Sequence, residues 1–196
     1  SANMFAVDGL ETWLIHNYLR PEETDFDKVD ADACVRAILG VGPDFQYEVL
    51  SRENWIGRRM LAERFRDRRV FIAGDAAHLW VPFGGYGMNA GIADAMNLSW
   101  MLAGVLKGWA DSAILAAHEA ERWPITEQVS QYAMGTAVAL ARTRAEVPAD
   151  IEVPGPIGDA VRAALGERLL EINTPQFCCG GLNFGSFYDA SPIIAP

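Results

Sequence analysis

The feature that most constrains the fold is an apolar run from Val70 to Ala73 that leads directly into Gly74 and Asp75. A glycine-rich segment, residues 82–89, follows it, and an apolar helix is then predicted from Ala90 to Leu106. That helix is apolar on nearly every face, which predicts a helix surrounded by protein. The pattern therefore predicts a short buried strand that delivers a carboxylate, beside a turn that opens a helix.

Such a strand, turn and helix suit a ligand that carries both hydroxyl and anionic groups. Asp75, at the carboxyl end of the predicted strand, would accept hydrogen bonds from sugar or polyol hydroxyls. The glycines from Gly84 to Gly87 remove side chains, so that the backbone could approach a flat ring. A helix starting near Met88 would direct free N–H groups toward the ligand. On these residues alone a simpler interpretation stays open, in which Asp75 caps its own turn.

Residues Gly85 to Ala90 also match the pattern G-x-G-x-x-G/A of dinucleotide-binding turns. In that fingerprint the glycines follow a strand directly, whereas ten residues separate Ala73 from Gly84. The segment after the helix is again helical, so no strand completes a βαβ unit. We therefore reject this interpretation. His78 and Asn97 are predicted to be packed, hydrogen-bonded residues rather than ligands.

Elsewhere the chain mixes strand and helix patterns, which predicts a mixed α/β fold class. Runs rich in β-forming residues predict two strands, Thr12–Leu19 and Phe45–Ser51. Residues 55–65 favour extended backbone, and residues 66–69 a polar turn. Capped periodic runs predict three helices. The first covers Ala31–Leu39, between Asp30 and Gly40, and the third runs from Asp159 to about Leu170. The second runs from Asp111 or Ser112 to about Glu146, with a kink or split at Pro124. The tail from residue 173 onward predicts ordered loop with brief strands.

Composition narrows the class of protein. The 196 residues carry a formal charge of −10, which argues against a nucleic-acid partner because such a partner needs a basic surface. No apolar run is long enough for a membrane span, and the N-terminus lacks the pattern of a signal peptide. The three cysteines, Cys34, Cys178 and Cys179, fit a reducing compartment. These features predict a cytoplasmic protein without membrane or nucleic-acid partners.

The glycine-rich segment and its surroundings resemble the second flavin-contacting motif of FAD-dependent aromatic hydroxylases, the group typified by p-hydroxybenzoate and phenol hydroxylases. The positions that carry the resemblance are Gly74-Asp75-Ala76-Ala77-His78, Pro82, Gly84-Gly85, Gly87-Met88-Asn89, Gly91, Asp94-Ala95 and Asn97-Leu98. Similarity continues in Trp55, Ala62–Phe65, Glu119–Pro124, Leu182–Asp189 and Ser191-Pro192. The resemblance therefore covers most of the chain.

The resemblance implies a fragment of the FAD/NAD(P)-binding flavin-hydroxylase fold. Residues 1–68 would form part of a substrate-binding β-sheet, residues 69–146 the second half of the FAD-binding domain, and residues 147–196 a C-terminal helix and ordered tail. The family's N-terminal G-x-G-x-x-G motif for the ADP moiety is absent, and Asp8-Gly9 lacks the Ser and Arg of the middle motif. We expect docking to the missing N-terminal half, or a homo-oligomer.

The resemblance also implies the contacts with FAD. Asp75, next to Gly74, would hydrogen-bond the ribityl chain, and Pro82 would lie against the flavin. Gly84 and Gly85 would form the loop beside the ring, and the backbone amides of Gly87, Met88 and Asn89 would face its pyrimidine edge. Val81 stands where many relatives have a proline. No catalytic acid or base, metal ligand or substrate-binding residue is assigned.

The chemistry implied by the resemblance is hydroxylation of a small aromatic substrate. NAD(P)H would reduce FAD, dioxygen would form a flavin hydroperoxide, and its distal oxygen would attack the aromatic ring. The chain alone is expected to be incomplete and inactive. Two alternatives stay open: another flavin-dependent oxidoreductase such as a halogenase or reductase, and a non-catalytic oligomerisation or binding module.

Overall fold

The computed structural model describes residues 2–19 and 22–194, which divide between two compact units, Ser1–Ile56 and Gly57–Pro196. Short strands and long helices occur together, as the predicted mixed α/β class requires. The longest elements belong to the second unit: α2 (Tyr86–Leu106), α3 (Ala116–Ala145) and α4 (Pro156–Phe177). No helix of the described residues is long and apolar enough to cross a membrane.

The first unit contains an antiparallel pair, β1 (Ala2–Ala6) and β2 (Trp13–Asn17), which confirms the strand predicted here. The Asp8 carboxylate shapes the connection by accepting the backbone N–H groups of Leu10 at 2.9 Å and Thr12 at 3.0 Å. Hydrogen bonds of Leu10 and then of Thr12 lower the pKa of Asp8 to about 2. The hairpin is therefore fixed by a local side chain.

Helix α1 (Ala31–Leu39) begins and ends as predicted. The Asp30 side chain accepts the N–H of Ala33 at 3.0 Å, which supplies a partner for one of the free N–H groups at the start of the helix. Gly40 ends the helix with a left-handed φ of 66°. A short 3-10 turn, η1 (Phe26–Lys28), precedes it. The boundaries of α1 are thus set by residues adjacent to it.

The strand predicted over Phe45–Ser51 is wrong, because these residues have no regular secondary structure. Side chains of α1 hold the segment instead. The Arg36 guanidinium donates to the carbonyl oxygen of Phe45 at 3.2 Å, and the Tyr47 hydroxyl donates to the Asp32 carboxylate. A strand needs a neighbouring backbone to pair with, and here side chains of a helix take that place.

The strands of the second unit are two-residue pieces in two antiparallel pairs: β3 (Met60–Leu61) with β6 (His78–Leu79), and the hairpin of β4 (Arg66–Asp67) with β5 (Val70–Phe71). The predicted polar turn is therefore reduced to Arg68 and Arg69, and the predicted buried strand to β5. Val70 is 66% exposed, whereas Phe71 is half-buried and packs against a buried cluster that includes Met101, so the prediction of a fully buried strand is wrong for Val70.

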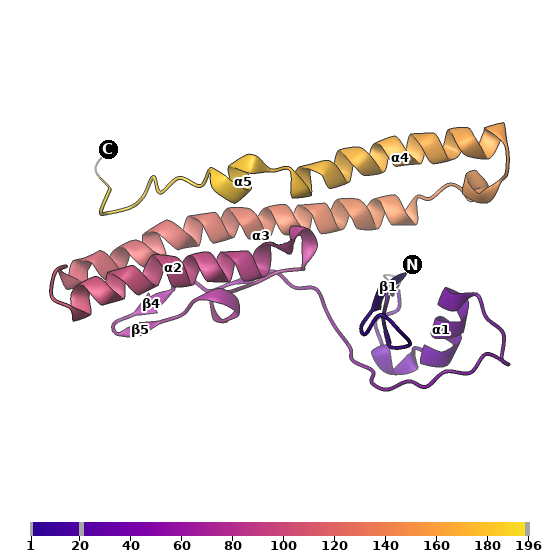
Figure 1. Cartoon of the computed structure of the whole chain (residues 1–196), viewed down its shortest axis with the longest axis horizontal. Helices are drawn as coiled ribbons and strands as arrows, with labels where there is room; N and C mark the ends of the chain where they lie inside the picture. The colour runs from indigo at the N-terminus through magenta and orange to yellow at the C-terminus, as the bar shows by residue number, and fades with distance from the viewer. Residues whose placement is uncertain (1, 20–21, 195–196) are drawn as a thin grey trace. The chain divides into compact units, whose positions relative to one another are not determined.

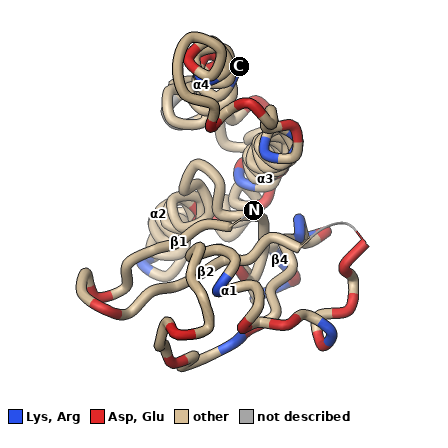
Figure 2. Tube along the Cα trace, turned by 90° about the vertical axis from the view of Figure 1, so that its right-hand side faces the viewer, with Lys and Arg blue, Asp and Glu red and all other residues tan. Residues whose placement is uncertain are grey.

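Helix α2 starts at Tyr86, four residues earlier than the predicted Ala90, and ends at Leu106 as predicted. The prediction that protein surrounds it is wrong for the described residues, since four apolar side chains along one face are exposed. We call them the α2 stripe: Met88, Ile92, Met96 and Trp100. Their spacing of four residues places them on one face. Figure 2 shows the tube of α2 almost entirely tan, because Asp94 is its one charged residue.

Helix α3 lies between α2 and α4 in the second unit (Figure 1). It follows a 3-10 turn, η4 (Ser112–Leu115), that Asp111 caps as predicted. Of the kink or split predicted at Pro124, the split is wrong, because the helix is continuous through the proline. Trp123 donates its indole N–H to the Ala62 carbonyl at 3.0 Å, and Ile125 is buried. Packing on both sides therefore holds the helix across the proline.

Helix α4 is longer than predicted and begins with Pro156 at its first position, where the missing N–H has no consequence. A short helix, α5 (Gly180–Phe184), follows, and the described part of the tail contains none of the brief strands predicted there. The buried apolar core lies mainly between α2 and α3, in two clusters: Tyr86, Ile125, Val129 and Ala133, and Met101, Leu115 and Ala117.

Candidate functional site

Asp75 lies on a 3-10 turn, η2 (Gly74–Ala76), and not at the end of a buried strand as predicted. Strand β5 has already ended at Phe71, and Gly74 turns the chain with a left-handed φ of 58°. The Asp75 side chain is exposed and has no hydrogen bond or ion pair with another described residue. Its carboxylate oxygens are therefore available to accept hydrogen bonds from a ligand.

The turn that carries Asp75 packs tightly on α2. The backbone N–H of Gly74 donates to Asp94 Oδ2 at 3.0 Å, and the Ala77 N–H donates to the Gly74 carbonyl at 2.8 Å. A Cβ atom placed on Gly91 would lie 3.3 Å from the Cα of Gly74, so a glycine permits this close approach. Asp75 is thereby held beside the first turns of α2.

The second predicted loop forms a 3-10 turn, η3 (Phe83–Gly85), directly before α2. Gly84 and Gly85 both have a φ of 70°, a conformation that glycine adopts readily. A Cβ on Gly84 would lie 2.3 Å from a ring carbon of Tyr86, whereas a Cβ on Gly85 would meet open space. Pro82, just before the turn, is exposed. The two glycines therefore let the chain reverse without side chains over the loop.

Helix α2 presents its N-terminal end at this loop. It begins at Tyr86, whereas the sequence predicted a start near Met88. Gly87, Met88 and Asn89 thus lie in the first turn, where backbone N–H groups lack partners within the helix. The Asn89 side chain donates to the Gly85 carbonyl at 2.8 Å, and both Met88 and Asn89 are exposed. This end of a 21-residue helix is therefore open to an anionic group.

The predicted flavin-contacting residues thus fall on three adjoining pieces of chain: η2, the loop through η3, and the first turn of α2. The riboflavin portion of FAD fits this arrangement in three respects. A free carboxylate suits the ribityl hydroxyls, a loop of glycines leaves room for a flat ring, and the helix N-terminus suits the electron-rich pyrimidine edge. The individual contacts stay predictions.

A buried polar group behind the turn was not predicted as a unit. We call it the Asp94 cluster: Asp94, His78 and Arg122. Asp94 is fully buried, and its carboxylate lies 2.7 Å from His78 Nε2 and 2.7 Å from Arg122 Nε. Burial opposes ionisation, yet the hydrogen bonds from His78, Arg122 and the Gly74 N–H together lower the pKa of Asp94. The carboxylate is therefore ionised and held from three sides.

A second buried polar group lies one helical turn further along α2. Asn97 donates to Glu121 Oε2 at 2.5 Å, and its side-chain oxygen lies 2.9 Å from His118 Nδ1. The Ser191 hydroxyl donates to the other oxygen of Glu121 at 2.6 Å, which ties the C-terminal tail to α3. Burial lowers the pKa of His118. The predictions that His78 and Asn97 are packed and hydrogen-bonded are confirmed.

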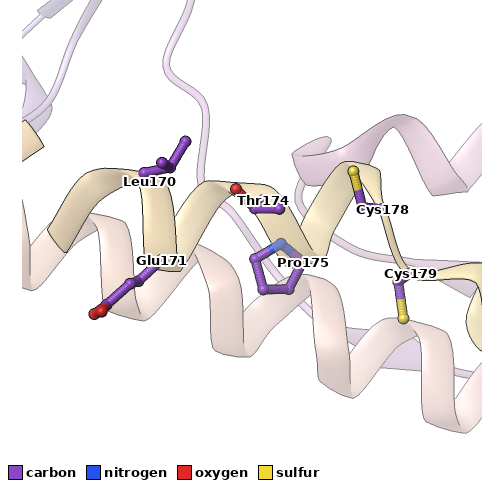
Figure 3. Close-up of a pocket in the computed structure, with 6 residues that line it drawn as sticks. All are labelled: Leu170, Glu171, Thr174, Pro175, Cys178 and Cys179. Carbon is purple, nitrogen blue, oxygen red and sulfur yellow. The ribbon is translucent and has the colours of Figure 1, made fainter. Parts of the chain in front are cut away.

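The end of α4 adjoins the glycine loop. The buried Tyr86 hydroxyl donates to the Gln176 carbonyl at 2.6 Å, which joins the start of α2 to α4. Nearby, an open cavity of about 620 Å³ is lined by Leu170, Glu171, Thr174, Pro175, Cys178 and Cys179 (Figure 3). Both cysteines are free thiols, and their sulfur atoms point in different directions. Among the described side chains, no His, Cys, Asp and Glu cluster is placed to hold a metal ion.

Comparison with known proteins identifies the family. Residues 9–133 match a family model described as FAD binding domain, which is more than half of the chain. The chain therefore belongs to this FAD-binding family. Its curated relatives include the FAD-dependent monooxygenase apdD of Emericella nidulans, 37% identical over 176 residues, and a putative polyketide hydroxylase of Streptomyces halstedii, 38% identical over 175 residues. The resemblance to FAD-dependent aromatic hydroxylases is confirmed.

These alignments cover 85% and 84% of the chain but only 28% and 30% of the two relatives. Among solved structures, the rebeccamycin biosynthetic enzyme RebC with reduced flavin is similar, with a TM-score of 0.73 and 36% identity over 87% of this chain and 32% of that one. The flavin-dependent monooxygenase PieE, solved with FAD and substrate, shares the fold with a TM-score of 0.74 at 24% identity. The chain therefore has a part of the larger fold of flavin-dependent monooxygenases.

Proposed function

We propose that the chain is the C-terminal portion of an FAD-dependent monooxygenase that acts in the cytoplasm. The observation that carries the proposal is the exposed, unpartnered carboxylate of Asp75 held beside a glycine loop and an open helix N-terminus. That arrangement occurs within the segment that matches the FAD-binding family. A carboxylate that only capped its own turn would be engaged by that turn, and Asp75 is not.

The residues of this chain would bind and orient the cofactor. Asp75 would accept hydrogen bonds from the ribityl hydroxyls, Pro82 would lie beside the ring, and the backbone of Gly84 and Gly85 would border it. The first-turn amides at Gly87, Met88 and Asn89 would donate to the pyrimidine edge. With NAD(P)H as the reductant and dioxygen as the oxygen source, bound FAD would supply the transfer of one oxygen atom to an aromatic ring.

The α2 stripe supports the proposal that this chain docks with a further portion of the flavoprotein. Met88 is 75% exposed and Met96 is 68% exposed, although both lie within the family-matched segment. Apolar faces of this extent mark surfaces that another protein element covers. We therefore propose that the isolated chain is inactive, binds FAD weakly, and associates either with the missing N-terminal half or with itself.

Two experiments test the proposal. A visible spectrum of the purified chain is expected to show no stoichiometric flavin band, and a full band would overturn the proposal of an incomplete site. In the complete flavoprotein, NAD(P)H oxidation that depends on a small aromatic substrate and yields a hydroxylated product supports the monooxygenase. A halogenated product, or oxidation of NAD(P)H without oxygen transfer to the substrate, would instead show a halogenase or a reductase.

A further inference from the structure

Asp94 is hydrogen-bonded to the residue directly before Asp75. Its Oδ2 atom accepts the N–H of Gly74 at 3.0 Å. We propose that Asp94 is a positioning residue for flavin binding: it fixes the turn that carries Asp75 and thereby sets FAD affinity without touching the cofactor. The inference rests on the function proposed above and extends it to a residue that is buried beneath the site.

Few other hydrogen bonds hold the turn. Within η2 the Ala77 N–H donates to the Gly74 carbonyl at 2.8 Å, and the left-handed Gly74 has no side chain to hold it. Glycine has the largest conformational freedom to lose on ordering. The Asp75 side chain is exposed and unpartnered, so the backbone of the turn alone decides where its carboxylate lies. From outside the turn, Gly74 also packs against Gly91, and the Ala77 carbonyl accepts the N–H of Ala62 at 2.8 Å. Asp94, however, supplies the side-chain hydrogen bond that holds Gly74 itself.

Asp94 is itself held rigidly enough to serve as an anchor. Arg122, on α3, donates to its Oδ1 at 2.7 Å, and His78, on β6, lies 2.7 Å from its Oδ2. Hydrogen bonds to an ionised carboxylate are stronger than those between neutral groups. Because Asp94 is on α2, the same bond also fixes the turn relative to the α2 N-terminus. The bond thereby fixes the distance between the Asp75 carboxylate and the first-turn amides of α2, the two groups that would contact the flavin.

If Asp94 only stabilised the fold, its loss would affect FAD binding no more than the loss of a similar buried residue. Asn97 is that matched comparison. Asn97 is three residues further along α2, is buried, and bonds across to Glu121 of α3 as Asp94 does to Arg122. It has no hydrogen bond to the turn. If the buried polar side chains only stabilise the packing of α2 on α3, loss of either should affect FAD binding equally.

The test measures FAD affinity and stability of three variants in the complete flavoprotein. Asp94→Ala is expected to weaken FAD binding about tenfold or more, whereas Asn97→Ala stays within about twofold of the parent. Asp94→Asn retains an oxygen that can accept the Gly74 N–H. It is therefore expected to keep most of the affinity, although its stability falls because Arg122 loses its counter-charge. Apoprotein is titrated with FAD, and unfolding is followed in urea.

Equal weakening of FAD binding by Asp94→Ala and Asn97→Ala overturns the inference. If Asp94→Ala does not fold, amide hydrogen exchange in the unsubstituted apoprotein decides instead. The Gly74 amide is expected to be protected, and exchange at the rate of an unstructured glycine amide overturns the inference. This readout does not need flavin. A parent protein that binds no FAD at all would contradict the proposed function, while the exchange of Gly74 would still report the anchoring.

Discussion

The two adjacent left-handed glycines before α2 allow a matched comparison of stability. Gly84 and Gly85 have the same φ of 70°, so an alanine at either position incurs a backbone strain of about 1–2 kcal/mol. Only Gly84 faces an obstacle, because its Cβ would lie 2.3 Å from the Tyr86 ring. That ring must move, although Tyr86 is 7% exposed and its hydroxyl donates to Gln176.

Displacing Tyr86 costs about 1.5–3 kcal/mol of apolar burial and about 0.5–1.5 kcal/mol of hydrogen bonding. Gly84→Ala should therefore lower the free energy of unfolding by about 2–4.5 kcal/mol more than Gly85→Ala. Urea denaturation followed by circular dichroism measures both variants, with equal slopes against urea as the check on two-state behaviour. Equal losses for the two variants would refute the packing of Tyr86 against Gly84.

Three further predictions concern the buried charges and the exposed face of α2. Arg122→Met leaves the Asp94 carboxylate without its cation and should lower the free energy of unfolding, measured in urea, by about 3–5 kcal/mol. Adding Asp94→Leu to this variant should recover part of the lost stability, and no recovery would contradict the pairing. Burial lowers the pKa of His118 below its ordinary 6.5, so just below that pH the unfolded chain binds more protons than the folded chain. Stability should therefore fall as the pH is lowered from about 7.5 through 6.5, and less steeply in His118→Gln. Ile92→Gln with Met96→Gln should reduce self-association in light scattering at unchanged stability, since these side chains are 53% and 68% exposed.

Local sequence was sufficient where structure is decided by neighbouring residues. The limits of α1 follow from Asp30 and Gly40, and the start of η4 from Asp111. The glycine motif likewise predicted a turn before a helix, and the structure places Gly84 and Gly85 in left-handed conformations there. In each case the determining side chain, or its absence, lies within a few residues of the backbone that it shapes.

Features that depend on distant contacts were not predictable from local pattern. The segment after α1 has strand-forming residues, but Arg36 and Tyr47 fix it through side-chain bonds. The Asp94 cluster joins residues 16 and 28 positions away along the chain, and no spacing rule brings them together. The separation of Asp94 and Asn97 by three residues did place both on one face of a helix. That was a usable indication of a buried polar face.

The measurement that tests the central claim most directly is the FAD affinity of Asp75→Asn in the complete flavoprotein. Asp67→Asn is the matched control, because Asp67 is an exposed aspartate on β4 and belongs to none of η2, η3 and α2. If Asp75 accepts the ribityl hydroxyls, the loss of its charge should raise the dissociation constant for FAD about tenfold, and the control should leave it unchanged. An Asp75→Asn variant that binds FAD as tightly as the control would contradict the assignment of this turn to the flavin site.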